Sequence, residues 1–242
     1  MITKSIPSIL TLGNLSLGVI SIILVYNERS GMAAIMIIIA MLLDAVDGLV
    51  ARALNAQSEF GKELDSLADV ISFGVAPAFI MYVVALQDVT PMVSWFVTAL
   101  FPICGALRLA RFNVKSGSPG HFIGLPIPAA GGILATVALF NGEVAPIVFI
   151  ITSVVLALLM VSNIRYPSFK RIGIPKNAVW VIPIIVVASI IIGILFEKHL
   201  SKIFFIPLIL YVLYGLKKTI RRRSKRKQQY NIQEEEQSEK HA

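Results

Sequence analysis

The chain has 242 residues and a formal net charge of +8; 56% of its residues are hydrophobic and 15% are charged. Its mean hydropathy of +0.79 excludes an ordinary soluble domain and predicts an integral membrane protein that crosses the bilayer several times. The single cysteine, Cys104, excludes an intrachain disulfide, and the three histidines show no paired spacing typical of a zinc site.

Charged residues and proline- or glycine-marked breaks divide the chain into eight apolar segments. Most of these approach the ~20 residues that a helix needs to cross a bilayer. They run over residues 6–26, 31–53, 62–86, 91–113, 126–141, 144–163, 177–196 and 202–217. The sequence therefore predicts an all-α integral membrane bundle with about eight transmembrane helices.

The distribution of basic residues predicts the orientation. Eight spans put both termini on one side. This side then contains 19 of the 22 lysines and arginines. They lie at Lys4, in the links at 52–62, 108–115 and 165–176, and in the tail. By the positive-inside rule this side is cytoplasmic. We therefore expect a multi-pass cell-membrane protein with both termini in the cytoplasm.

The tail at 218–242 is basic at first and then rich in glutamate. This pattern is typical of a topology anchor with a disordered end, and the basic part would also be attracted to anionic membrane lipids. Because its positive charges adjoin a membrane span, we do not expect the chain to bind nucleic acid.

Acidic residues gather where the second and third spans approach the cytoplasmic side. Four of the five aspartates lie within 26 positions, at Asp44, Asp47, Asp65 and Asp69. A carboxylate at the centre of a transmembrane helix costs roughly 2.5–3.5 kcal/mol. Four together need a cation to offset this cost, and a divalent metal ion is the simplest one.

Helical periodicity predicts how these side chains are presented. Gly48 lies about 40° and Arg52 about 80° around the helix from Asp44, so two carboxylates, small residues and one guanidinium share a face. Asp65 and Asp69 lie one turn apart on the next span. In the link, Asn55 and Ser58 are suited to a turn and to capping a helix.

Four carboxylates suit hard cations such as Mg²⁺ or Mn²⁺, with Ca²⁺ as an alternative at one site. With room for two ions, the arrangement fits two-metal phosphoryl chemistry, in which Arg52 would contact a phosphate. A second interpretation is an ion network that only positions helices, but Arg52 and Arg108 would neutralise only two acids. A third is a cation-transport site, although the acids lie near span ends and come with a glycine-lined face.

The spacing Asp-x2-Asp-Gly-x2-Ala-Arg-x8-Gly-x3-Asp-x3-Asp, which starts at Asp44, resembles the signature of the CDP-alcohol phosphotransferases. All eight defining positions are filled. The segments 60–77, 108–113 and 122–130 look like the phosphatidylserine synthase branch of that family. The resemblance is strong over residues 5–135 and faint beyond.

The resemblance implies a fold and a site. Residues 1–163 would form a six-helix catalytic core, with two additional spans at 164–217 and the tail at 218–242. Asp44, Asp47, Asp65 and Asp69 would bind two divalent ions, and Asp69 would also act as the general base. The residues that match positions contacting the cytidine diphosphate are Gly48, Arg52 and Ser58.

The resemblance also implies a reaction in which L-serine attacks CDP-diacylglycerol and CMP leaves. Other acceptor alcohols (glycerol phosphate, inositol phosphate or choline) remain alternatives, and a homodimer is expected. Arg108 and Arg111 are candidates to bind the carboxylate of serine or a lipid phosphate. Asn14 is a candidate to reach the nucleotide or to bridge helices, and Gly18, Gly131 and Gly132 are expected to serve helix packing.

Overall fold

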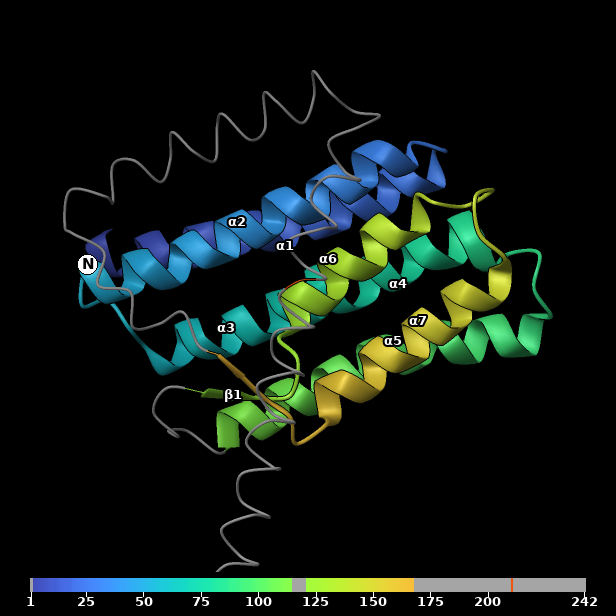
Figure 1. Ribbon diagram of the computed structural model, residues 1–242. Coiled ribbons are helices and arrows are strands. Elements are labelled where there is room, and N and C mark those ends of the chain that lie inside the picture. Colours follow the sequence, from blue (N-terminus) through green and yellow to red (C-terminus); the bar gives the residue numbers. More distant parts are fainter. Residues whose placement is uncertain (1, 115–120, 168–209, 211–242) are drawn as a thin grey trace, which may run out of the picture.

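The computed structural model describes residues 2–114, 121–167 and 210. Within these ranges, four helical rods are long and apolar enough to cross a membrane, and Figure 1 shows them running side by side. They are α1 (Ile2–Tyr26), α2 (Ser30–Ala53), a rod that extends from Glu59 to Leu86, and α5 (Pro91–Val114). The first four predicted spans are thereby confirmed as apolar helices, and the chain is a helical membrane protein.

The third rod contains two π-helical segments. It consists of α3 (Glu59–Asp69), η1 (Val70–Val75), α4 (Ala76–Met81) and η2 (Tyr82–Leu86). Pro77 has no N–H to donate to the preceding turn, so a regular α-helical ladder cannot pass through it. The rod begins three residues before the predicted start because Ser58 caps it, accepting a hydrogen bond from the Gly61 N–H at 3.0 Å.

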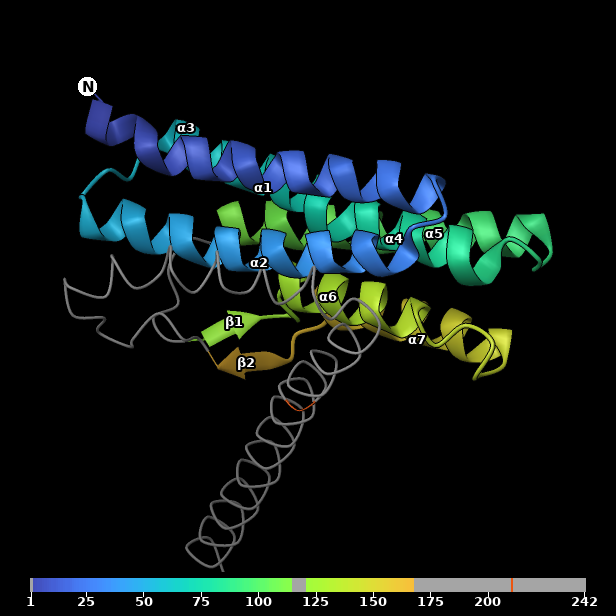
Figure 2. The same ribbon diagram turned by 90° about the horizontal axis from the view of Figure 1, so that it is seen from above.

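Two shorter apolar helices, α6 (Ile127–Ala138) and α7 (Pro146–Val161), lie alongside the long rods (Figures 1 and 2). They have 12 and 16 residues, which is below the usual length of a membrane span. Helix α6 starts directly after Pro126, one residue after the predicted start of the fifth segment, and ends three residues before its predicted end. The predicted spans at 177–196 and 202–217, and the tail, lie outside the described residues.

A short pair of antiparallel strands, β1 (His121–Ile123) and β2 (Arg165–Pro167), lies beside the end of the bundle where α5 ends (Figure 1). Phe122 is opposite Tyr166 in the register. The sequence did not predict this pair, because three residues are too few to show an alternating pattern. The Tyr166 side chain is fully buried in the core.

Close backbone approach fixes η1 between two neighbouring helices. A Cβ atom on Gly18 of α1 would lie 2.5 Å from Ser72 Oγ, and one on Gly131 of α6 would lie 2.4 Å from the carbonyl oxygen of Phe73. The packing role expected for these two glycines is confirmed. Because η1 follows Asp69 directly, these contacts also fix the depth at which the acids of α3 lie.

We predict that Gly131→Ala destabilises the bundle. The added methyl group would meet a backbone oxygen that cannot rotate away, and overpacking of this kind costs about 1–3 kcal/mol. Thermal unfolding in detergent measures the effect. The matched control is Gly74→Ala, where the new Cβ would meet its nearest atoms at 3.4 Å. Equal melting temperatures for both variants would contradict the prediction.

Candidate active site

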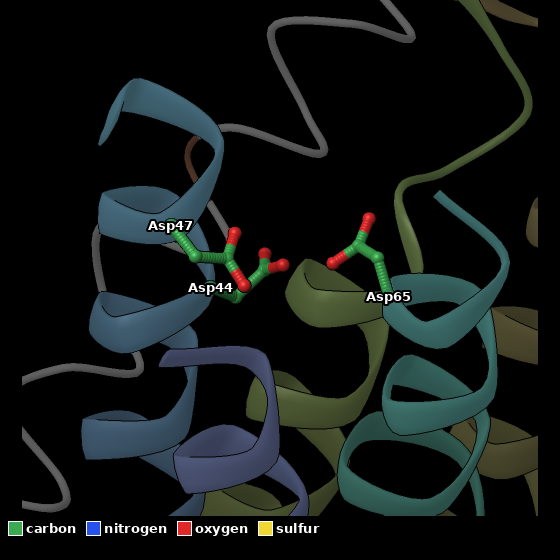
Figure 3. Close-up of side chains that lie close together, drawn as sticks. All are labelled: Asp44, Asp47 and Asp65. Carbon is green, nitrogen blue, oxygen red and sulfur yellow. The ribbon is translucent and has the colours of Figure 1, made fainter. Parts of the chain in front are cut away.

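Three carboxylates from two helices meet at one point. Asp44 and Asp47 of α2 face Asp65 of α3 (Figure 3), and one oxygen from each lies within 4.8 Å of the others. The predicted arrangement, in which the acids of the second and third spans face each other, is confirmed for these three residues.

Asp69 lies one turn deeper on the same rod as Asp65. Its side chain is 7% exposed, and its Oδ1 has no hydrogen-bond partner among the described residues. It lines the same cavity as the other three acids. A buried carboxylate oxygen without a partner is costly unless a cation or a donor from outside the chain satisfies it.

Two arginines partly balance the acids. The positive charge of Arg108, on α5, acts on Asp44 and Asp69, whereas that of Arg52 acts on Asp47. Arg108 is buried and Arg52 is exposed. With Lys62, which lines the same cavity, three positive charges stand against four carboxylates, so a net negative charge remains in a poorly solvated place. Carboxylate oxygens at this spacing are the donor set that hard divalent cations prefer, so these residues fit such ions.

Two adjoining cavities surround the acids. The larger, about 700 Å³, is lined by α1, the end of α2, the 54–58 link and the start of α3. The smaller, about 300 Å³, is lined by α2, α3, the end of α5 and the segment that enters α6. Six residues line both cavities: Asp47, Gly48, Arg52, Lys62, Asp65 and Phe112. The site can therefore hold two reactants with the carboxylates between them.

Three residues expected to contact a nucleotide lie around the larger cavity. Gly48 and Arg52 come from the last turns of α2, and Ser58 precedes α3. The chain reverses between the two helices at Asn55, which has a φ of 49°, as its turn-forming character predicted. Because the 54–58 link is short, these three residues lie on one side of the acids.

Thr11 of α1 is a site residue that the sequence interpretation missed. Its side chain is 4% exposed, and its hydroxyl donates to Asp47 Oδ2 at 2.8 Å. The signal that could have found it is its position three residues before Asn14, so that two polar side chains lie one turn apart in a mostly apolar helix. This contact orients one carboxylate of the cluster from outside the two acidic helices.

Asn14 itself is fully buried, and neither of its side-chain polar atoms has a partner among the described residues. Its backbone carbonyl accepts a hydrogen bond from Ser72 Oγ at 3.0 Å. The side chain lines neither of the two cavities. The structure thus joins α1 to η1 at this position through the backbone, and the nucleotide contact expected for Asn14 stays a prediction.

Arg111 also lies outside the lining of both cavities. Its guanidinium donates to the carbonyl oxygens of Ile123, Val161 and Ser162 at 3.0–3.2 Å. It therefore ties α5 to the end of α7 and to β1, and satisfies carbonyl groups that the end of a helix leaves open. In this structure Arg111 connects α5 to α7 and β1, whereas Arg108 lines the smaller cavity.

Comparison with known proteins agrees with this geometry. The sequence profile described as CDP-alcohol phosphatidyltransferase matches residues 4–159. The chain belongs to the CDP-alcohol phosphatidyltransferase family. The matched range contains the four aspartates of the site and nearly all of the described helices.

Several curated members of this family are similar over most of their length. A CDP-diacylglycerol–serine O-phosphatidyltransferase of Helicobacter pylori is 36% identical, covering 87% of this chain and 89% of its own. One of the same name from Bacillus subtilis is 41% identical, covering 69% and 92%. An archaetidylserine synthase of Methanothermobacter thermautotrophicus is 39% identical, covering 70% and 72%.

We predict that Thr11→Val weakens the binding of a divalent cation to this family member. Valine keeps the shape of threonine but removes the donor to Asp47, and loss of a hydrogen bond to a metal-binding side chain typically lowers metal affinity about tenfold or more. Titration with Mn²⁺ followed by electron paramagnetic resonance measures this affinity. Thr98→Val is the control, because Thr98 donates only to a backbone carbonyl of α5. Unchanged affinity in Thr11→Val would contradict the prediction.

Proposed function

We propose that this protein transfers the phosphatidyl group of CDP-diacylglycerol to L-serine and releases CMP. The observation that carries the proposal is the group of buried and half-buried carboxylates at two adjoining cavities, in a chain whose similar relatives are named for this transfer. The names of the relatives agree on serine as the acceptor and include both phosphatidyl and archaetidyl products.

Asp44, Asp47, Asp65 and Asp69 would hold two divalent cations, Mg²⁺ or Mn²⁺, with Ca²⁺ as an alternative at one site. The bound ions would balance the charge of the diphosphate during an in-line displacement. The spacing of the carboxylate oxygens and the unpartnered Oδ1 of Asp69 support this assignment.

The larger cavity would bind the cytidine diphosphate. Gly48 keeps the wall thin, because it has no side chain between the helix backbone and the cavity. Arg52 is exposed there and is able to contact a phosphate through two parallel hydrogen bonds. Ser58 uses an oxygen lone pair to cap α3, which leaves its hydroxyl proton available to a ligand.

The reaction would be a direct displacement. The serine hydroxyl oxygen forms a bond to the lipid-side phosphorus, the bond from that phosphorus to the CMP oxygen breaks, and the hydroxyl proton moves to Asp69. Arg108, beside Asp44 and Asp69, would hold compensating charge next to the reacting groups. The burial of Asp69 and its open Oδ1 support the role of base.

We extend the proposal to the architecture. Residues 1–163 would be the six-helix catalytic core, supported by a family match that ends within α7. Two further spans at 164–217 and the tail at 218–242 would follow. The acidic site and both termini would face the cytoplasm at the cell membrane, and the enzyme would act as a homodimer.

Membranes that contain the protein should release CMP from CDP-diacylglycerol when serine and Mg²⁺ or Mn²⁺ are present. If CMP were released with glycerol phosphate, inositol phosphate or choline, but not with serine, that alcohol would be the acceptor in place of serine. If no alcohol gave CMP and vesicles took up the cation, the protein would be a transporter.

Asp69→Asn should abolish CMP release while the protein still folds and inserts into the membrane. Asparagine is close to aspartate in shape but cannot accept the proton. The control is Asp88→Asn, which changes the remaining, exposed aspartate in the turn after η2. If Asp69→Asn were about as active as the unmodified protein, Asp69 would not be the general base.

A further inference from the structure

Asn14 has no role in the reaction described above, although it lies on the face of α1 that packs against the site. Thr11, Asn14, Gly18 and Ser21 follow one another at intervals of three or four residues, and all four are buried. They therefore form one face of the helix. The hydroxyl groups of Thr11 and Ser21 both donate to α2. The side chain of Asn14 is the polar group of this face that has no partner in the described part of the chain.

Contacts with α2 place Asn14 at the depth of the acids. Helices α1 and α2 are joined by the short turn at 27–29 and lie side by side (Figure 2). A Cβ atom on Gly13, which directly precedes Asn14, would lie 2.9 Å from Leu43 Cδ2. Leu43 in turn directly precedes Asp44. Asn14 is therefore beside the turn of α2 that carries the first acid of the site.

Contacts with η1 place the Asn14 amide near the level of Asp69. Two short links separate α1 from the third rod, so both run in the same direction. The Asn14 carbonyl accepts a hydrogen bond from Ser72 Oγ at 3.0 Å, and Ser72 lies about 4.5 Å beyond Asp69 along the axis. Side chains of a helix lean toward its N-terminus. The amide of Asn14 thus extends from the level of Ser72 toward that of Asp69.

Buried oxygens on both helices are open at this depth. Neither polar atom of the Asn14 side chain has a hydrogen-bond partner among the described residues, and the same is true of Asp69 Oδ1. Asn14 is 0% exposed and Asp69 is 7% exposed, so water does not satisfy them as it would at a surface. Because Asn14 lines neither cavity, its position favours a partner held among the acids over a nucleotide.

A neutral oxygen is a suitable further ligand for a site that already has four carboxylates. Hard divalent cations take about six or more oxygen ligands, and the side-chain carbonyl of asparagine is one of their usual donors. A fifth carboxylate would increase the repulsion within the site. An amide oxygen adds a ligand without adding charge.

We infer that the side-chain oxygen of Asn14 is a neutral ligand of the divalent cation bound by Asp69. Asn14 binds this cation from the side of α1, away from both cavities, so that α1 as well as α2 and α3 holds the ions. This inference rests on the proposed function, because it adds a residue to the proposed two-ion site.

Mn²⁺ binding by the full-length protein in detergent tests the inference. Asn14→Leu keeps the approximate size of the side chain but removes its oxygen. It should lower the affinity for one of the two ions about tenfold or more, as the loss of a contact in a metal site typically does. Titration followed by electron paramagnetic resonance measures the affinity. The matched control is Ser21→Ala, which removes a buried polar group from the same face of α1 and should leave Mn²⁺ affinity unchanged.

Thermal unfolding distinguishes a ligand from a residue that only packs. In EDTA, Asn14→Leu should melt no lower than the unmodified protein, because it removes a buried amide that has no partner. At a fixed Mn²⁺ concentration its melting temperature should rise by less, because stabilisation by a ligand falls as its affinity falls. Equal losses of melting temperature in EDTA and in Mn²⁺ would show a packing residue and overturn the inference.

Asn14→Asp is a second variant that keeps an oxygen at this position but adds a negative charge. In EDTA it should melt at a lower temperature than the unmodified protein, because a fifth carboxylate joins the four already present. Mn²⁺ should then raise its melting temperature by more than it raises that of the unmodified protein. A smaller rise would overturn the inference, even if Asn14→Leu did not fold.

The failures are distinguishable. If the unmodified protein bound no Mn²⁺, the proposed two-ion site itself would be wrong. If the unmodified protein bound two ions and Asn14→Leu bound both with the same affinity, only the inference would be overturned. Normal Mn²⁺ binding by Asn14→Leu together with a raised KM for CDP-diacylglycerol would assign Asn14 to the nucleotide instead.

Discussion

Mutual repulsion among four carboxylates in a poorly solvated pocket is the constraint around which this protein is built. Asp44, Asp47 and Asp65 approach one another closely, and Asp69 lies buried beside them. A low-dielectric environment magnifies each repulsion, and the nearby arginines offset only part of it. Under the proposed function, divalent cations would relieve this repulsion and prepare the site for a substrate that itself brings a diphosphate. The same negative charge would then provide the affinity for those ions.

The rest of the bundle holds these charges at fixed positions. The close contacts of Gly18 and Gly131 with η1 limit movement of the third rod along its axis. The acids of α3 are therefore held near those of α2. Thr11 orients Asp47 from α1. Arg111 ties α5 to α7 and to the strand pair. Dense packing of this kind transmits a local change to the site, whereas a looser bundle would let the carboxylates separate.

Helical periodicity and hydropathy predict those features that arise within one helix, or between two helices that follow each other in the chain. These features are the first four spans, the shared face of Asp44 and Gly48, and the approach of the acids of α2 and α3 across a short link. Contacts between helices distant in the chain left no periodic signal. The hydrogen bond from Thr11 to Asp47 joins residues 36 positions apart, and the ties of Arg111 depend on where α7 ends. The strand pair was missed for the same reason, since each strand is defined only by its distant partner.

The most direct measurement is the electron paramagnetic resonance spectrum of the full-length protein in detergent, saturated with Mn²⁺. Two ions held by one set of carboxylates lie about 3.5–4 Å apart, so their spins couple and the spectrum differs from that of isolated Mn²⁺. The coupled signal should disappear in Asp65→Asn and persist in Asp88→Asn. A spectrum of isolated ions in the unmodified protein, or a coupled signal that survives the loss of the Asp65 carboxylate, would contradict a shared two-ion site.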